Sequence, residues 1–221
     1  MFIIIQARMS SKRLPGKVLT KIKDKYLLDY LLDRLNYIKE SHKIIIATSN
    51  HSSDDEIFNF CKKKNIICFR GDLNNVSKRY FDLINFYNID SFVRICGDSP
   101  LIDPNIINNA ITLFRSGKFD LVTNKYPRSF PVGQTIEIIN SNSYKKLFKS
   151  ISNESEEEHV SLHLYNNPKA LIIKNIKNSL DCSNFNLAID DPNDLKKYQN
   201  FLNKFDYDIK NMSFEEVILN Y

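Results

Sequence analysis

The stretch FIIIQARMSSKRLPGKVLTKIKDKYLLDYLLDRLNYIKESHKIIIAT, residues 2–48, decides the fold. It opens with a continuous apolar run of strand length at residues 2–7. Residues 27–38 then repeat apolar side chains at intervals of three and four, as a helix does, and a second buried-type strand follows at residues 43–48. A strand, a helix and another strand in this order predict a βαβ unit with parallel strands.

The alternation of strands and helices continues along the chain. Before residue 100 we expect a helix opening at residues 53–56, a strand at 66–69, a helix at 76–87 and a strand at 91–96. The later elements that we expect are helices at 104–116, 141–150, 154–165 and 192–205 and strands at 120–124, 135–139, 170–174 and 186–189. The strand at 135–139 alternates in polarity and is expected to be antiparallel. The pattern predicts an α/β fold whose mostly parallel sheet is covered on both faces.

Composition narrows the class of protein. The chain has 221 residues, enough for one sizeable core, with 43% hydrophobic and 26% charged residues, which excludes disorder and coiled coil. No apolar run approaches the roughly 20 residues that span a bilayer, and no signal peptide is recognisable, so we expect a cytoplasmic protein that binds no membrane. The net charge of +5 is not gathered in blocks, and we predict no nucleic-acid partner. The four cysteines form no CxxC pair and are interpreted as free thiols.

The loop after the first strand carries the strongest chemical signal. In open α/β sheets ligands bind at the carboxyl ends of the strands, and residues 6–17 lie at such an end. The loop reads QARMSSKRLPGK and holds four basic side chains, two hydroxyls and a Pro-Gly turn. Arginine forks, a lysine and backbone amides are the groups that hold a polyphosphate, whereas the glycines of a P-loop or a GxGxxG fingerprint are absent.

Two acidic residues are placed to complement this basic loop. Asp98 follows the strand at 91–96 within the sequence Gly97-Asp98-Ser99-Pro100, and Asp190 follows the late strand at 186–189. Carboxylates beside a triphosphate suggest Mg²⁺, which takes one or two carboxylates and fills its remaining positions with water and phosphate oxygens. Asp191 and Asp103 are interpreted as helix caps.

Six ordered motifs resemble a known family. They are IIIQARMSSKRLPGKVL, ATSNHSSDDEIFNFC, FRGD with NVSKRY, VRICGDSPLIDP, EEHV and LAIDDPNDL, and they are similar to the cytidylyltransferase superfamily that activates acidic sugars, especially to the spore-coat polysaccharide biosynthesis F type. The resemblance covers nearly the whole chain. It implies one GT-A-like domain over residues 1–221, Rossmann-like with three α/β/α layers, that transfers CMP from CTP to a sugar and releases pyrophosphate.

The resemblance also assigns roles to single residues. It makes Arg8, Lys17 and Asp98 catalytic, and Asp98 and Asp190 the two ligands of Mg²⁺. The residues that it implies for nucleotide binding are Gln6, Ala7, Arg8, Ser10, Arg13, Lys17, Thr48, Ser49, Arg79 and Gly97. The expected reaction is an in-line displacement at the α-phosphorus, in which no covalent nucleophile takes part.

The acceptor side departs from the family pattern. Val132 and Thr135 stand where relatives usually have acids, which suggests a different or a relaxed choice of sugar. Arg128 is a candidate for binding a substrate carboxylate, the alternative being an arginine that packs its loop. Glu137 is a candidate for orienting an acceptor hydroxyl.

The EEHV motif adds two candidates for substrate binding. They are Glu158 and His159, the latter expected on a helix. We expect residues 125–165 to bind the acceptor and, as in some relatives, to contribute to a homodimer. Two other functions stay open: a GT-A glycosyltransferase that uses a nucleotide-sugar, and a nucleotide-binding homologue without catalysis.

Overall fold

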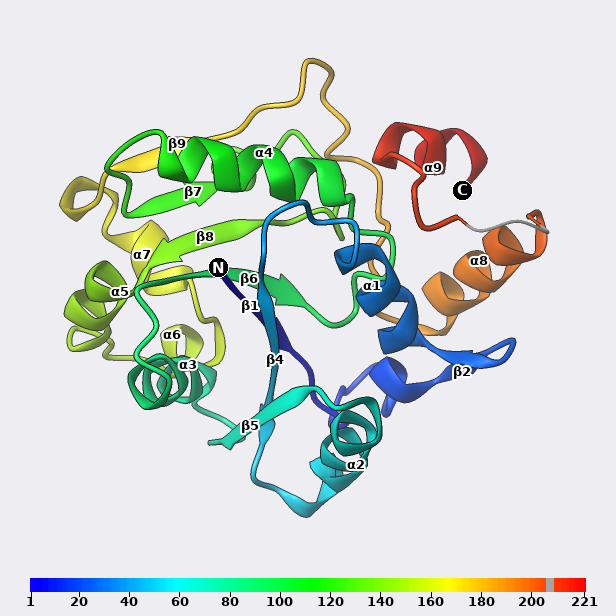
Figure 1. The fold of residues 1–221 in the computed structure, drawn as a ribbon, viewed down its shortest axis with the longest axis horizontal. Helices are drawn as coiled ribbons and strands as arrows, with labels where there is room; N and C mark the ends of the chain where they lie inside the picture. Colours follow the sequence, from blue (N-terminus) through cyan, green and yellow to red (C-terminus); the bar gives the residue numbers. More distant parts are fainter. Residues whose placement is uncertain (206–208) are drawn as a thin grey trace.

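A single mixed sheet organises the computed structural model, which describes residues 1–205 and 209–221 (Figure 1). The strand order is β5-β4-β1-β6-β8-β7-β9. The strands are β1 (Phe2–Gln6), β4 (Lys43–Ser49), β5 (Ile67–Gly71), β6 (Ser91–Cys96), β7 (Leu121–Thr123), β8 (Glu137–Asn140) and β9 (Ile173–Asn175). Within this seven-stranded sheet of the described residues, only β8 runs antiparallel to its neighbours, β6 and β7, and the other pairs are parallel. The expected α/β fold with a mostly parallel mixed sheet is therefore confirmed.

Helices cover both faces of this sheet, as the apolar strands require. They are α1 (Leu27–Leu35), α2 (Asp55–Lys64), α3 (Val76–Phe86), α4 (Pro104–Arg115), α5 (Ser141–Phe148), α6 (Glu154–Glu158), α7 (Leu162–Asn166), α8 (Pro192–Asn203) and α9 (Phe214–Asn220). In Figure 1, α3, α5, α6 and α7 gather on one side of the sheet, and α1, α2 and α4 lie on the other. None of the helices in the described residues is long and apolar enough to cross a membrane.

The side-chain alternation of β1 explains the two layers. Ile3 and Ile5 belong to the core beneath α1, α2 and α4, whereas Ile4, between them, belongs to the core beneath α3 and α5. All three are fully buried, and each burial stabilises the fold by roughly 1.5–3 kcal/mol. A strand buried on both faces reads as a continuous apolar run, which is why the sequence reveals β1 so clearly.

Several expected elements differ in detail from the structure. The helix expected at 154–165 is broken into α6 and α7, with extended backbone at His159 (φ −106°, ψ 94°). The strand expected at 186–189 does not form: Asn186 makes only an isolated bridge to Val132. Two short elements were not expected, the hairpin of β2 (Lys21–Ile22) and β3 (Lys25–Tyr26) and the final helix α9. The expected caps at Asp103 and Asp191 are confirmed.

The segment 125–165 is built into the sheet. Its strand β8 lies between β6 and β7, and Glu137 stands opposite Arg94 in the register with β6. Gly133 brings the loop before β8 against the chain that leads to Asp190: Val132 donates a backbone hydrogen bond to Phe185 and accepts one from Leu187, both at 2.9 Å.

We expect Gly133→Ala to destabilise the protein by about 2–4 kcal/mol, measured by urea unfolding. Gly133 has a φ of +90°, and an added Cβ would lie 2.6 Å from the backbone nitrogen of Ala188. The control is Gly117→Ala, where the new Cβ meets only the side chain of Phe119 and the cost should stay below about 1 kcal/mol. Equal losses in the two variants would contradict this account of the loop.

Candidate active site

A basic side chain and two acidic ones meet at the carboxyl end of the sheet. Lys17 Nζ lies 2.7 Å from Asp98 Oδ2 and 2.9 Å from Asp190 Oδ1, and it also donates to the backbone oxygen of Ile189 at 2.9 Å. Arg13 adds a second cation, 3.3 Å from Asp190 Oδ2. The structure thus joins the three residues that the sequence places at separate strand ends.

Charge stabilises this cluster. Burial alone would lower the pKa of Lys17, but Asp98 and Asp190 outweigh it and raise the pKa, so Lys17 stays protonated. Burial alone would raise the pKa of Asp190, but Lys17 and Arg13 lower it, so this carboxylate stays ionised. The two acids thus converge on one point, with the ammonium group of Lys17 between them.

A cavity of about 380 Å³ opens over this cluster. Nine of the predicted site residues line it: Gln6, Ala7, Arg8, Arg13, Lys17, Asp98, Glu158, His159 and Asp190. Ser11, Lys12, Val18 and Cys96 complete the lining and were not singled out from the sequence. Cations from the first loop and the acids Asp98 and Asp190 thus line the same cavity.

An adjoining cavity of about 620 Å³ lies between the first loop, the β5–α3 loop and α6. It is lined by Arg8, Ser10, Lys12, Leu73, Asn74 and the acids Glu154, Glu157 and Glu158. Arg8 and Glu158 line both cavities and form an ion pair at 3.1 Å. Predicted residue Ser10 therefore belongs to this second space.

Four predicted nucleotide-binding residues lie beneath the cavity surface and support the segments that form it. Thr48 and Ser49 are fully buried and donate their hydroxyls to Asp54. Arg79 is fully buried and donates to the backbone oxygens of Asp72 and Leu73, so it shapes the loop beside the second cavity. A Cβ at Gly97 would lie 3.0 Å from the backbone oxygen of Gln6, which explains the glycine there.

On the acceptor side the structure corrects the expectation for Glu137 and the helical position expected for His159, and it favours the loop-packing alternative for Arg128. Glu137 is fully buried and cannot reach a hydroxyl in the cavity: one oxygen accepts from Arg94 and the other from Tyr165, both at 2.6 Å. Arg128 packs its own loop by donating to Pro131 and Thr135, and it does not line the cavity. His159 is exposed and follows α6 instead of lying on a helix, yet it lines the cavity as expected.

Asp54 is a site-building residue that sequence reasoning missed. Its fully buried carboxylate accepts from the backbone of Met9 at 2.8 Å and of Ser49 at 2.9 Å, and so ties the first loop to the end of β4. The helix-start pattern around residue 53 hides this role, because an acid in a first helical turn already has a local explanation. An acid at this position is therefore compatible both with the start of a helix and with a buried hydrogen-bond acceptor.

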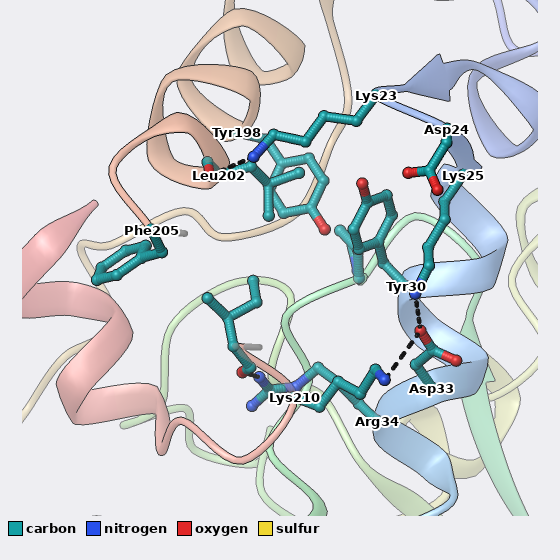
Figure 2. Close-up of a pocket in the computed structure, with 12 residues that line it drawn as sticks. Lys23, Asp24, Lys25, Tyr30, Asp33, Arg34, Tyr198, Leu202, Phe205 and Lys210 are labelled. Atoms are coloured by element: carbon teal, nitrogen blue, oxygen red, sulfur yellow. Dashed lines mark hydrogen bonds and ion pairs between the residues drawn. The ribbon is translucent and has the colours of Figure 1, made fainter. Parts of the chain in front are cut away.

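A further cavity of about 380 Å³ lies between the β2–β3 hairpin, α1 and α8 (Figure 2). The rings of Tyr30 and Tyr198 meet edge to face in its wall, and Lys25 pairs with Asp33. Lys23 spans it to donate to the backbone oxygen of Leu202. No predicted site residue lines it, so we place the active site in the cavity above Asp98.

Together, the parallel sheet, the basic first loop and the paired acids define a nucleotidyltransferase. Residues 2–216 match the cytidylyltransferase family, and the chain belongs to that family. It is a CTP-dependent nucleotidyltransferase.

Three relatives illustrate the match. A solved structure of a cytidylyltransferase from Leptospira borgpetersenii superposes with a TM-score of 0.91 at 32% identity, covering 98% of this chain and 91% of that one. The spore coat polysaccharide biosynthesis protein SpsF of Bacillus subtilis is 33% identical over 75% of this chain and 70% of its own length. The 8-amino-3,8-dideoxy-manno-octulosonate cytidylyltransferase of Shewanella sp. strain ANA-3 is 30% identical over 56% of this chain and 52% of its own length.

We expect Asp54→Asn to lower the free energy of unfolding at pH 7 by about 1–3 kcal/mol, because an amide places a donor among the donors that face Asp54. Hydrogen bonds from Ser49, Met9 and Thr48 outweigh the effect of burial and lower the pKa of Asp54 in the folded state. The stability that it supplies is therefore complete above its unfolded pKa, about 3.9, and is lost as the pH falls through the folded pKa. Urea unfolding between pH 7 and pH 3 should show the gap between wild type and variant narrowing in acid. A gap that stays constant or widens would contradict this role.

Proposed function

We propose that the protein transfers CMP from CTP to an acidic sugar, giving CMP-sugar and pyrophosphate. The observation that carries the proposal is the convergence of Asp98 and Asp190 on Lys17, at the end of a loop that also supplies Arg8 and Arg13. Cations that bind a triphosphate and acids that bind a divalent ion are the two requirements of nucleotidyl transfer.

The residues of the first loop neutralise the triphosphate. Arg8 and Arg13 present planar forks that match phosphate oxygens, and Lys17 adds a point charge. As the acceptor hydroxyl forms its bond to the α-phosphorus, the bond from that phosphorus to the pyrophosphate oxygen breaks, and negative charge grows on the leaving group. Side chains already fixed by hydrogen bonds stabilise that charge without reorganisation.

Asp98 and Asp190 fit a magnesium ion. Both offer carboxylate oxygens beside the cavity, and Mg²⁺ needs only one or two carboxylates when phosphate oxygens and waters complete its shell. Within residues 1–205 and 209–221, no cluster of three or more histidine, cysteine or acidic side chains offers a fuller ligand set. A bound Mg²⁺ would neutralise phosphate charge; Lys17 and Arg13 keep the two acids in place.

The names of two relatives support the proposed acceptor and pathway. The name of the Shewanella enzyme refers to an octulosonate, an acidic sugar, and that of SpsF refers to a surface polysaccharide. Glu158 and His159 line the cavity from the segment 125–165, which supports this segment as the acceptor side. We also infer a cytoplasmic enzyme of surface glycan synthesis. The homodimer implied by some relatives stays a prediction, measurable by light scattering.

We expect purified protein with CTP and Mg²⁺ to release pyrophosphate with at least one member of a panel of ulosonic and nonulosonic acids. Asp98→Asn should lower kcat by about 100-fold or more, because it removes a carboxylate from the charged cluster. The matched control is Asp103→Asn. Asp103 caps α4 and accepts from Phe214, so this variant should lose about 1 kcal/mol of stability and less than about threefold in kcat.

Equal loss of kcat in the two variants would contradict the assignment of Asp98. Tight CTP binding without turnover on any acceptor would indicate the inactive homologue instead. Hydrolysis of a nucleotide-sugar without pyrophosphate release would favour the glycosyltransferase.

A further inference from the structure

Gln6 stands at the floor of the cavity, at the carboxyl end of β1. Its neighbours in the sheet are Ala47 on β4 and Cys96 on β6, and it lines the cavity together with Cys96 and Asp98. Its side chain is partly exposed. An amide can face a ligand either with its oxygen, which accepts, or with its nitrogen, which donates two protons.

Arg94 decides which end of the amide faces the cavity. Nη2 of Arg94 lies 3.0 Å from Gln6 Oε1. A guanidinium group has donors and no acceptor, so the atom of Gln6 that meets it has to be the oxygen. In the part of the chain that the structure describes, Gln6 Nε2 has no hydrogen-bond acceptor, so its two protons are available to a ligand.

The position of Arg94 is fixed by its ion pair with the buried Glu137. Its Nη1 contacts Glu137 Oε2 at 2.6 Å, and Tyr165 donates to the other oxygen of Glu137 while bonding to Thr123 at 2.9 Å. The Arg94 side chain is 12% exposed and that of Glu137 is 0% exposed. Turning Arg94 away would leave a buried carboxylate without its partner, which is strongly destabilising. Gln6 therefore presents a donor to the cavity.

The triphosphate and the nucleoside are assigned to other parts of the site, so we consider the sheet end of the cavity for the acceptor. The first loop supplies the cations for the triphosphate, and Leu73 and Asn74 line the adjoining cavity beyond the Arg8–Glu158 ion pair, where a nucleoside can lie. The acceptor hydroxyl has to reach the α-phosphorus from the side opposite the departing pyrophosphate. The sheet end with Gln6, Cys96 and Asp98 lines the same cavity as the cations of the first loop, so an acceptor bound there faces the triphosphate.

We propose that Gln6, which the family resemblance assigns to the nucleotide, instead binds the acceptor sugar by donating a hydrogen bond from Nε2 to an oxygen of the sugar's carboxylate. This inference rests on the proposed function. A carboxylate oxygen only accepts, so it matches a donor whose orientation is fixed, and the pair formed by Gln6 and Arg94 favours acidic over neutral acceptors. Glu137 acts through Arg94 as a positioning residue.

The test compares Gln6→Leu and Gln6→Glu with wild type, using the sugar acid of the panel that gives the highest kcat/KM. Gln6→Leu removes the donor at similar volume and should raise KM for the sugar acid roughly 10- to 100-fold, the effect of one hydrogen bond to a charged group. Gln6→Glu keeps an acceptor for Arg94 but turns a carboxylate to the cavity, so its KM should rise further. In both variants KM for CTP should stay within about threefold of wild type. The matched control is Gln199→Glu on α8, the same chemical change outside both cavities, which should alter neither constant.

Three results would overturn the inference. They are an unchanged KM for the sugar acid, a parallel rise in KM for CTP, and a larger effect of Gln199→Glu than of Gln6→Glu. If the variants fail to fold, the Gln6 side-chain amide signals of ¹⁵N-labelled wild type decide: they should shift with the sugar acid and not with CTP, and the reverse refutes the inference. If no member of the panel is turned over, the proposed function fails first, which separates the two outcomes.

Discussion

One ammonium group holds together parts of the chain that lie far apart in the sequence. Lys17 Nζ bonds to Asp98, to Asp190 and to the backbone oxygen of Ile189, and so joins the first loop to the turn after β6 and to the segment before α8. Asp98 and Asp190 both contact Lys17 Nζ and therefore lie close enough to repel each other as carboxylates. The positive charge of the lysine offsets that repulsion. The backbone bond from Ile189 to Asp98, at 2.9 Å, closes the same junction. The position of both acids over the cavity depends on this contact.

A second buried pair sets the floor of the site. Arg94 and Glu137 face each other because β8 runs antiparallel beside β6, so the one reversal of direction in the middle of the sheet brings their charges together. Such a pair contributes little net stability, since desolvation offsets much of its attraction. The pair instead orients the side chain of Gln6, because Arg94 binds its oxygen and leaves its amide nitrogen to face the cavity. The proposed acceptor site is thus oriented by residues that lie beneath its surface.

The sequence predicted well what depends on local pattern. The strands buried on both faces, the long amphipathic helices, the basic loop and the acids at strand ends all produce regular signals along the chain. Its errors have physical causes. No glycine or proline marks the break at His159, which separates α6 from α7. Among the described residues, Asn186 forms an isolated bridge to Val132 where a strand was expected. Glu137 was predicted to orient an acceptor hydroxyl, because its partner Arg94 lies 43 positions away and meets it only once the sheet forms. Thr48, Ser49 and Arg79 carry family signals yet support the cavity wall from behind.

In the proposed function, the cluster around Lys17 is the centre of nucleotide binding and catalysis. Calorimetric titration of CTP, with Mg²⁺ present, into wild type and Lys17→Met tests this most directly. We predict a loss of affinity of about 10-fold or more in the variant, since a charged contact to phosphate disappears and two acids lose their counter-charge. Equal CTP affinities in two folded proteins would contradict it.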